Sequence, residues 1–233
     1  MRITSHGNIH QITFLPYIFP VNSYIYEEET TLTLIDIGTS SLCKPIVQLS
    51  RELKKPVTTI LFTHPHSDHI AGLDKIMDSF PDAKVYVSER DAPLLEGDFS
   101  LKTTEEQTKI KGGFTEVKTT PDFLMKENDT IGSLTVLAAP GHTPGSLAFY
   151  DKKSGILIVG DALQVKGGVA VAGDTRLFFP FPAFATWSKN EAVKSAKKLS
   201  NLKIRLLATG HGDMLEDPKE LILNAIARAE ANL

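Results

Sequence analysis

The chain has 233 residues, of which 42% are hydrophobic and 23% are charged, and its formal net charge is −3 at pH 7. This is an ordinary globular composition. The near-neutral charge argues against a basic nucleic-acid surface, so we expect no nucleic-acid partner. The single cysteine, Cys43, excludes an intrachain disulfide framework and a cysteine-based zinc site.

Neither a targeting segment nor a membrane span is expected. Residues 1–11 lack a long apolar run, and Pro16 and Pro20 interrupt the first apolar stretch. No apolar run is long enough to cross a membrane. These features predict a soluble cytoplasmic protein with no membrane partner. A small-molecule substrate is expected from the hydrolase hypothesis below. The oligomeric state stays open, with a homodimer among the options.

The first half of the chain alternates between strand and helix patterns. In chain order they predict strands over residues 9–15, 21–26 and 31–37, a helix over 42–54, a strand over 57–62, a helix over 70–80, a strand over 84–87 and a short helix over 88–95. The first three strands look like an antiparallel meander, and Ser40 or Ser41 is expected to cap the first helix. Residues 97–120 are polar and weakly periodic, which predicts a surface insertion that is partly helical over 104–110.

The second half repeats this order of strands followed by helices. It predicts strands over residues 123–126, 134–139, 146–150 and 156–159, a glycine-rich loop over 161–174, an aromatic loop over 176–184, a helix over 186–199 capped by Thr186 or Ser188, a strand over 204–208 and a terminal helix from 218. No linker separates the two rounds. We therefore expect a single domain over residues 1–233, with two packed sheets and helices outside them.

Residues 63–69, Thr-His-Pro-His-Ser-Asp-His, are the densest group of ligand-type side chains in the chain. They lie where the strand over 57–62 ends and a helix begins, which is where α/β sheets usually bind ligands. Imidazole nitrogens and carboxylates are ligands of zinc and similar ions. The cluster therefore predicts a metal site.

Three further ligand candidates share one pattern, an apolar strand followed by a small residue and a ligand-type side chain. They are His142, Asp161 and His211, each preceded by glycine. Flanking glycines let the backbone approach an ion or a substrate closely. His6 and His10 lack this context and are expected to be surface residues.

Seven candidate ligands are too many for one catalytic zinc ion, which normally keeps three protein ligands. They suit two divalent ions, with zinc favoured over manganese or iron. The expected arrangement is His64, His66 and His142 on one ion, Asp68, His69 and His211 on the other, and Asp161 as the bridge. A hydroxide between the ions would act as the nucleophile.

The run His64-x-His66-x-Asp68-His69, followed by Gly141-His142, Gly160-Asp161 and Gly210-His211, resembles the motifs of the metallo-β-lactamase-fold hydrolase superfamily. The resemblance covers nearly the whole chain in the expected order, including Asp36-Ile37-Gly38. It implies an α/β (α+β) fold of the four-layer αββα sandwich type. It also implies that Asp36 orients the metal ligands without binding the ions itself.

Several branches of the superfamily differ from this sequence. Exported β-lactamases often use a cysteine ligand, whereas Asp161 occupies the bridging position here. Glyoxalase II enzymes share the ligands but carry a C-terminal extension, and they tend to have histidine where Ser146 stands. Acyl-homoserine lactonases place a tyrosine after the bridging aspartate, and no tyrosine follows Tyr150. His66 argues against flavodiiron-type relatives, and the nuclease branch carries extra domains or basic exosites.

Three hypotheses follow. The first is a dinuclear hydrolase of a small ester, thioester or lactone, in which Asp68 also moves the proton of the hydroxide. Two loops would supply an apolar pocket through Tyr17, Ile18, Phe19, Phe178, Phe179 and Phe181. The second is a mononuclear-iron persulfide dioxygenase that uses His64, His142 and Asp161. The third is a non-catalytic binding module on the same fold.

Overall fold

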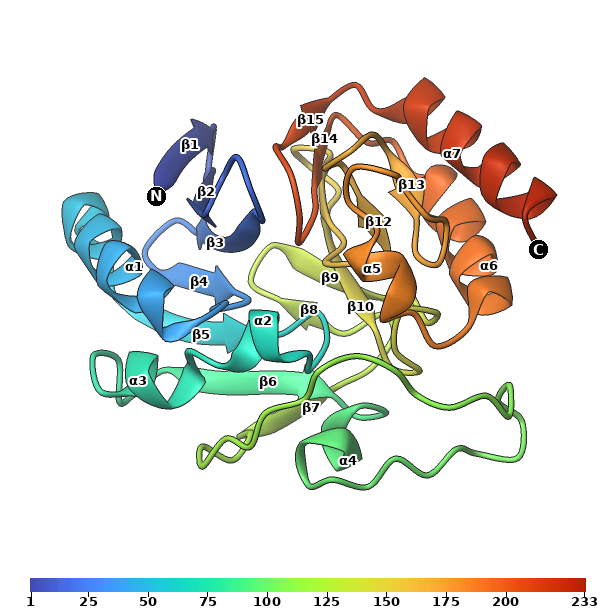
Figure 1. The fold of residues 1–233 in the computed structure, drawn as a ribbon. Coiled ribbons are helices and arrows are strands. Elements are labelled where there is room, and N and C mark those ends of the chain that lie inside the picture. The colour runs from blue at the N-terminus through green and yellow to red at the C-terminus, as the bar shows by residue number, and fades with distance from the viewer.

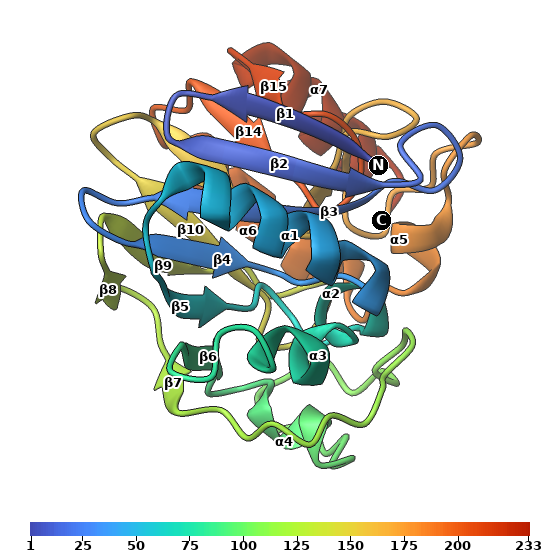
Figure 2. The same cartoon turned by 90° about the vertical axis from the view of Figure 1, so that its left-hand side faces the viewer.

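The computed structural model describes residues 1–233 as two β-sheets packed face to face between two layers of helices (Figure 1). Figure 2 shows helices α1 (Ser40–Leu53) and α3 (Leu73–Met77) lying in front of the first sheet, with the second sheet behind it. On the far side, α6 (Lys189–Ser200) and α7 (Lys219–Ala231) cover the second sheet. This is the αββα sandwich that the motif resemblance implies.

The first sheet has seven strands in sequence order: β1 (Arg2–His6), β2 (Ile9–Phe14), β3 (Val21–Glu27), β4 (Leu32–Ile35), β5 (Val57–Leu61), β6 (Lys84–Ser88) and β7 (Phe123–Met125). Neighbours pair antiparallel from β1 to β4 and parallel from β4 to β7. The predicted meander is therefore confirmed, and β1 is an additional edge strand that the sequence analysis missed.

The second sheet has the order β15 (Leu215–Glu216), β14 (Leu206–Ala208), β11 (Ile156–Ile158), β10 (Leu147–Asp151), β9 (Leu134–Ala138) and β8 (Thr130–Ile131). Its strands pair antiparallel except for β11 and β14. A separate two-stranded ribbon, β12 (Leu163–Gln164) with β13 (Ala170–Val171), lies within the predicted glycine-rich loop.

Strand alternation explains how three apolar layers form from these two sheets. In β3, Tyr24 and Tyr26 belong to the cluster between the sheets, whereas Ile25 belongs to the cluster under α1 and α3. Leu207 of β14 packs with α6 and α7, while its neighbours Leu206 and Ala208 face the first sheet. The central strands of each sheet thus bury both faces.

Some local predictions were wrong. The helix expected over 70–80 is two short helices, α2 (Ser67–Ile70) and α3, separated at Ala71 and Gly72. A Cβ at Gly72 would lie 2.6 Å from Ile37 Cγ2, so the break lets the chain pass close to the end of the first sheet. The cap of α1 is Thr39 rather than Ser40 or Ser41, whereas Ser188 caps α6 as expected by accepting a hydrogen bond from the Glu191 N–H.

Two loop regions also differ in detail from expectation. The short helix near residue 90 is only α4 (Ala92–Leu95), and the aromatic loop contains the helical turn α5 (Phe181–Phe184). Residues 97–120, which we call the strap, form the long green loop between α4 and β7 in Figure 1. The strap contains no helix, so the helix expected over 104–110 is absent. None of the helices combines the length and apolar composition that a membrane-spanning helix needs.

Candidate metal centre

All seven predicted ligands meet at one edge of the sandwich. His64, His66, Asp68 and His69 leave β5 and enter α2, while His142, Asp161 and His211 follow β9, β11 and β14. Their ligand atoms fall into three groups whose members lie within 4.8 Å of one another: His64, His66 and His142; Asp68, His69 and His211; and His64, His69 and Asp161. The first two groups are the two sets that the sequence analysis assigns to the two ions.

Asp36, at the end of β4, supports this edge from inside the core. Its carboxylate accepts hydrogen bonds from the Thr63 N–H and hydroxyl, at 2.8 and 2.7 Å, and from His69 Nδ1 at 2.8 Å. Its φ of +53° lies in the left-handed region, which costs a non-glycine residue roughly 1–3 kcal/mol. The surrounding hydrogen bonds hold that conformation, as the predicted orienting role of Asp36 requires.

Each of the five histidines has one ring nitrogen occupied outside the cluster. Thr63 donates to Asp36, so its hydroxyl oxygen accepts from His64 Nδ1 at 3.1 Å. Backbone carbonyls accept only, so the proton sits on His66 Nε2, 2.9 Å from the Lys111 oxygen, and on His211 Nδ1, 2.6 Å from the Pro20 oxygen. The other nitrogen of each ring points into the cluster.

His142 follows the same rule. Thr186 donates its hydroxyl proton to the Pro182 carbonyl at 2.7 Å, so its oxygen accepts from His142 Nδ1 at 3.2 Å. His142 Nε2 then carries a lone pair and faces the lone pair of His66 Nδ1 at 2.9 Å. Two lone pairs at this distance repel each other unless a cation lies between them, so the donor set fits a bound metal ion.

Three buried polar atoms in the cluster have no hydrogen-bond partner: His64 Nε2, His69 Nε2 and Asp161 Oδ1. They belong to the third ligand group, which shares His64 with the first group and His69 with the second. A buried polar atom without a partner costs about 1–3 kcal/mol. Coordination to an ion would satisfy all three atoms.

Electrostatics divide the cluster into a neutral and a charged part. Burial lowers the pKa of His142 to about 3, and the nearby His66 ring adds to the effect. Burial acts the same way on His211, but the Asp161 and Asp68 carboxylates outweigh it and raise the pKa of His211 to about 10. Burial would raise the pKa of Asp161, yet His211 and His69 hold it well below its usual range. The carboxylates of Asp161 and Asp68 thus stabilise positive charge beside His211.

Of the seven side chains, Asp68 is the one that reaches solvent. Its side chain is 34% exposed, whereas the other six residues are at most 4% exposed. Asp68 Oδ2 lies 3.3 Å from His211 Nε2. This places a carboxylate at the open side of the cluster.

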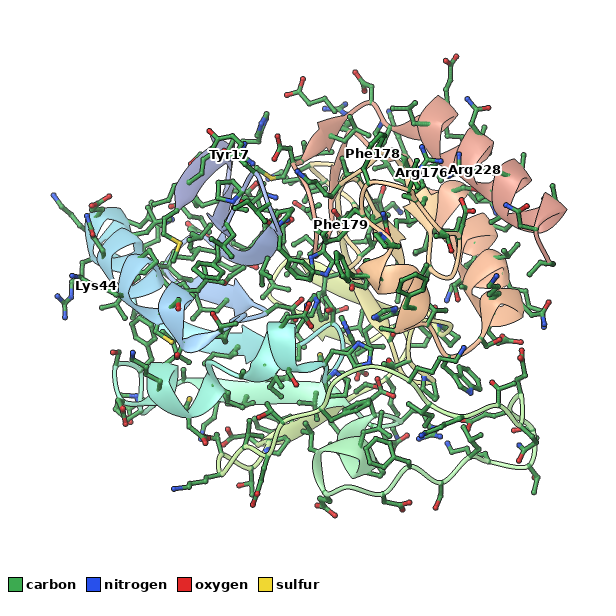
Figure 3. All side chains as sticks on the ribbon, in the orientation of Figure 1. Tyr17, Lys44, Arg176, Phe178, Phe179 and Arg228 are labelled. Atoms are coloured by element: carbon green, nitrogen blue, oxygen red, sulfur yellow. The ribbon has the colours of Figure 1, made fainter.

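The predicted pocket residues form two different groups. Tyr17 and Phe178 are more than 80% exposed, and Phe181 is 51% exposed, whereas Phe179 is buried. Phe19 packs on Phe179 and Phe181, with ring centroids 5.1 and 4.9 Å apart. Phe19 and Phe179 also contact the His211 ring. Figure 3 shows Tyr17, Phe178 and Phe179 along the upper boundary between the two halves of the molecule.

Some functional neighbours were not identified from the sequence. Phe114 of the strap packs against His66, with ring centroids 4.9 Å apart, and Thr63 and Thr186 hold ligand rings. Phe114 and Thr186 have no local signal, because the rings they contact are more than forty residues away, and the role of Thr63 depends on its hydrogen bond to the distant Asp36. The prediction that His10 is a surface residue was wrong. It is buried and bonded to Ser5 and Glu27 on the first sheet.

Comparison with known proteins agrees with this geometry. The model of the metallo-beta-lactamase superfamily matches residues 16–211. The chain belongs to this superfamily. It is 49% identical over 231 residues to the Bacillus subtilis (strain 168) protein YobT, covering 99% of both chains. It is also 23% identical over 214 residues to the probable metallo-hydrolase YybB of the same strain, covering 92% of this chain and 90% of the relative.

More distant superfamily members match as well. A hydroxyacylglutathione hydrolase of Synechococcus sp. (strain JA-2-3B'a(2-13)) is 28% identical over 151 residues, which is 63% of this chain and 51% of that enzyme. The crystal structure of the BLEG-1 B3 metallo-beta-lactamase superimposes with a TM-score of 0.68 at 24% identity, covering 91% of this chain and 96% of that one. The chain is accordingly a metal-dependent hydrolase of the metallo-beta-lactamase superfamily.

Proposed function

We propose that this protein is a dinuclear metal-dependent hydrolase that cleaves a small ester, thioester or lactone with an apolar part. The observation that supports it best is the set of buried nitrogen and oxygen atoms without a hydrogen-bond partner in the group of His64, His69 and Asp161, which shares a member with each of the other two groups. His64, His66 and His142 would hold one ion, Asp68, His69 and His211 the other, and Asp161 would bridge them. Ions bound there supply a nucleophilic hydroxide at neutral pH and stabilise negative charge on the substrate carbonyl oxygen.

The protein's own residues then have distinct tasks. Asp36 and Thr63 hold the rings of His69 and His64 with their free nitrogens directed into the cluster. Asp68 is the carboxylate at the solvent side, so it is placed to accept a proton from the attacking water and deliver it to the leaving group. The buried Phe179 excludes water from one side of His211.

The exposed aromatic rim supports an apolar substrate. Tyr17, Phe178 and Phe181 expose large apolar surfaces, and Phe181 packs on Phe19 and Phe179, whose rings contact His211. Burying one such side chain against a ligand contributes roughly 1.5–3 kcal/mol. The hydroxyacylglutathione hydrolase relative motivates the inclusion of thioesters among the candidate substrates.

Metal content per chain is the first test. Elemental analysis of protein purified without added metal or chelator should find about two zinc or manganese ions per chain, the number that a dinuclear site holds.

A screen of aliphatic esters, thioesters and lactones should then show rates that rise with acyl length. Phe181→Ala should lower kcat/KM for the longest substrates roughly tenfold and leave acetyl esters unchanged.

The persulfide dioxygenase remains the competing outcome of the same measurement. About one iron per chain, the count of a two-histidine, one-carboxylate site, together with oxygen consumption on glutathione persulfide, would replace the hydrolase proposal. Unchanged ester and lactone hydrolysis after His64→Ala and His66→Ala would also count against a metal-dependent hydrolase.

A further inference from the structure

The strap lies directly on one metal-ligand candidate, His66. The Lys111 carbonyl accepts from His66 Nε2 at 2.9 Å, and the Gly113 carbonyl accepts from the Ser67 N–H at 2.9 Å. A Cβ on Gly112 would fall 2.1 Å from His66 Nε2, so only glycine lets the strap approach this closely. His66 is 3% exposed, while Lys111, Gly112 and Gly113 are all exposed. A single layer of chain therefore separates His66 from water.

This contact decides which nitrogen His66 offers to an ion. The Lys111 carbonyl can only accept, so it holds the ring proton on Nε2 and leaves a lone pair on Nδ1, which faces His142. The Phe114 ring blocks rotation of the imidazole from one side. Without the strap, His66 would lose the partner that fixes both its orientation and its tautomer.

The strap is attached to the rest of the protein at both ends of this contact. Before it, Thr108 and Trp187 exchange two hydrogen bonds, from Thr108 Oγ1 to the Trp187 carbonyl and from Trp187 Nε1 to the Thr108 carbonyl. After it, the Asp74 carboxylate accepts from the backbone N–H groups of Lys118 and Thr119. Ile110 is the strap's buried hydrophobic residue and packs with Leu94 and Trp187.

We propose that the strap is the positioning element of His66, and that strap closure and ion binding at His64, His66 and His142 are coupled. The proposal rests on the metal site proposed above. Polar anchors and one buried apolar side chain give the strap a low local stability compared with the strands of the core. An ion that binds the closed form more tightly must stabilise the closed strap by the same factor.

Neighbouring glycines provide a matched test. Gly112→Ala places a methyl group on the His66 ring, whereas a Cβ on Gly113 would come no closer than 3.6 Å to Ser67 Oγ. Gly97 has a positive φ of +79° but open space around it, so Gly97→Ala controls for backbone strain alone. In Zn²⁺ titrations of the metal-free proteins, we expect Gly112→Ala to bind one of its two ions roughly tenfold more weakly, within the range of measured coupling.

The two controls, Gly113→Ala and Gly97→Ala, should bind both Zn²⁺ ions with the affinity of the wild type. Equal affinity for both ions in Gly112→Ala would overturn the proposal. Fewer than two ions in the wild type would count instead against the dinuclear function, so the two failures are distinguishable.

Trypsin provides a second measurement that needs no glycine variant and no substrate. Lys109 and Lys111 are exposed and lie beside the His66 contact. Zn²⁺ should slow cleavage at these lysines roughly tenfold in the wild type. His66→Ala should lose this protection, whereas His211→Ala, which alters the other ligand group, should keep it. Equal protection in both variants, or none in the wild type, would contradict the coupling.

Discussion

His66 and His69 lie three residues apart in one motif, yet their support differs. A carboxylate inside the core, Asp36, holds His69, while a backbone carbonyl of an exposed strap holds His66. The His142 turn resembles the first case, because the buried Asp91 accepts hydrogen bonds from Thr143 and Gly145. The comparison shows that one cluster of side chains is held partly by buried carboxylates and partly by the backbone of an exposed loop.

Removing the ions should have the largest effect and should affect both kinds of support. Chelation should abolish hydrolysis and lower the free energy of unfolding by about 4 kcal/mol for each ion removed, relative to protein at a thousandfold excess of Zn²⁺ over Kd. Denaturant unfolding with and without Zn²⁺ measures this difference. Full activity in protein shown by elemental analysis to be metal-free would contradict it.

Asp91 should give the core-supported part a characteristic pH dependence. Burial outweighs its hydrogen bonds and raises the pKa of Asp91 to about 6. As the pH rises, the unfolded state therefore loses this proton before the folded state does. The stability that protonated Asp91 contributes below pH ~4 is lost as the pH rises through about 6. As the pH rises from ~4 to ~7 in metal-free protein, the free energy of unfolding of Asp91→Asn should increase by up to about 3 kcal/mol relative to that of the wild type.

Denaturant unfolding across this range gives the difference between the two proteins at each pH. A difference that stays constant with pH would refute the assignment. The comparison is made between variants because the histidines contribute equally to both.

Replacing Asp36 should weaken ion binding at the group that contains His69. In Asp36→Asn, an NH₂ group replaces the carboxylate oxygen that accepts from both His69 Nδ1 and the Thr63 hydroxyl. The new N–H donors would then face two other hydrogen-bond donors. Loss of such a supporting group typically costs 10–100-fold in metal affinity, roughly 1.4–2.7 kcal/mol. Zn²⁺ titration should show this loss while metal-dependent protection of the strap persists. The exposed Asp82→Asn serves as the control and should behave like the wild type.

Releasing the far end of the strap should have the smallest effect. Asp74→Ala removes the acceptor for Lys118 and Thr119, with an expected cost of about 1 kcal/mol in a partly exposed place. Tryptic cleavage after Lys111 should rise roughly fivefold, and the unfolding midpoint of the core should hardly change. A large loss of global stability would mean that the strap belongs to the cooperative core.

Local patterns in the sequence predicted much of this structure. Alternation predicted the meander and the central strand, and the placement of ligand residues after apolar strands located all seven members of the cluster. These features work because a strand end fixes where the next side chain emerges. The errors at α1 and α2 arose from cap geometry and from close packing at Gly72, which depend on distant neighbours.

Sequence alone therefore predicted the superfamily motif, the layered fold and the seven side chains that cluster, since each depends on residues that are adjacent or evenly spaced. Tertiary structure decided which nitrogen of each histidine is free, that Phe179 is buried while Phe178 is exposed, and that the strap covers His66. These facts depend on contacts such as Lys111 with His66 and Thr186 with His142, which join parts of the chain more than forty residues apart. No local periodicity records such contacts, because only the folded chain brings the partners together.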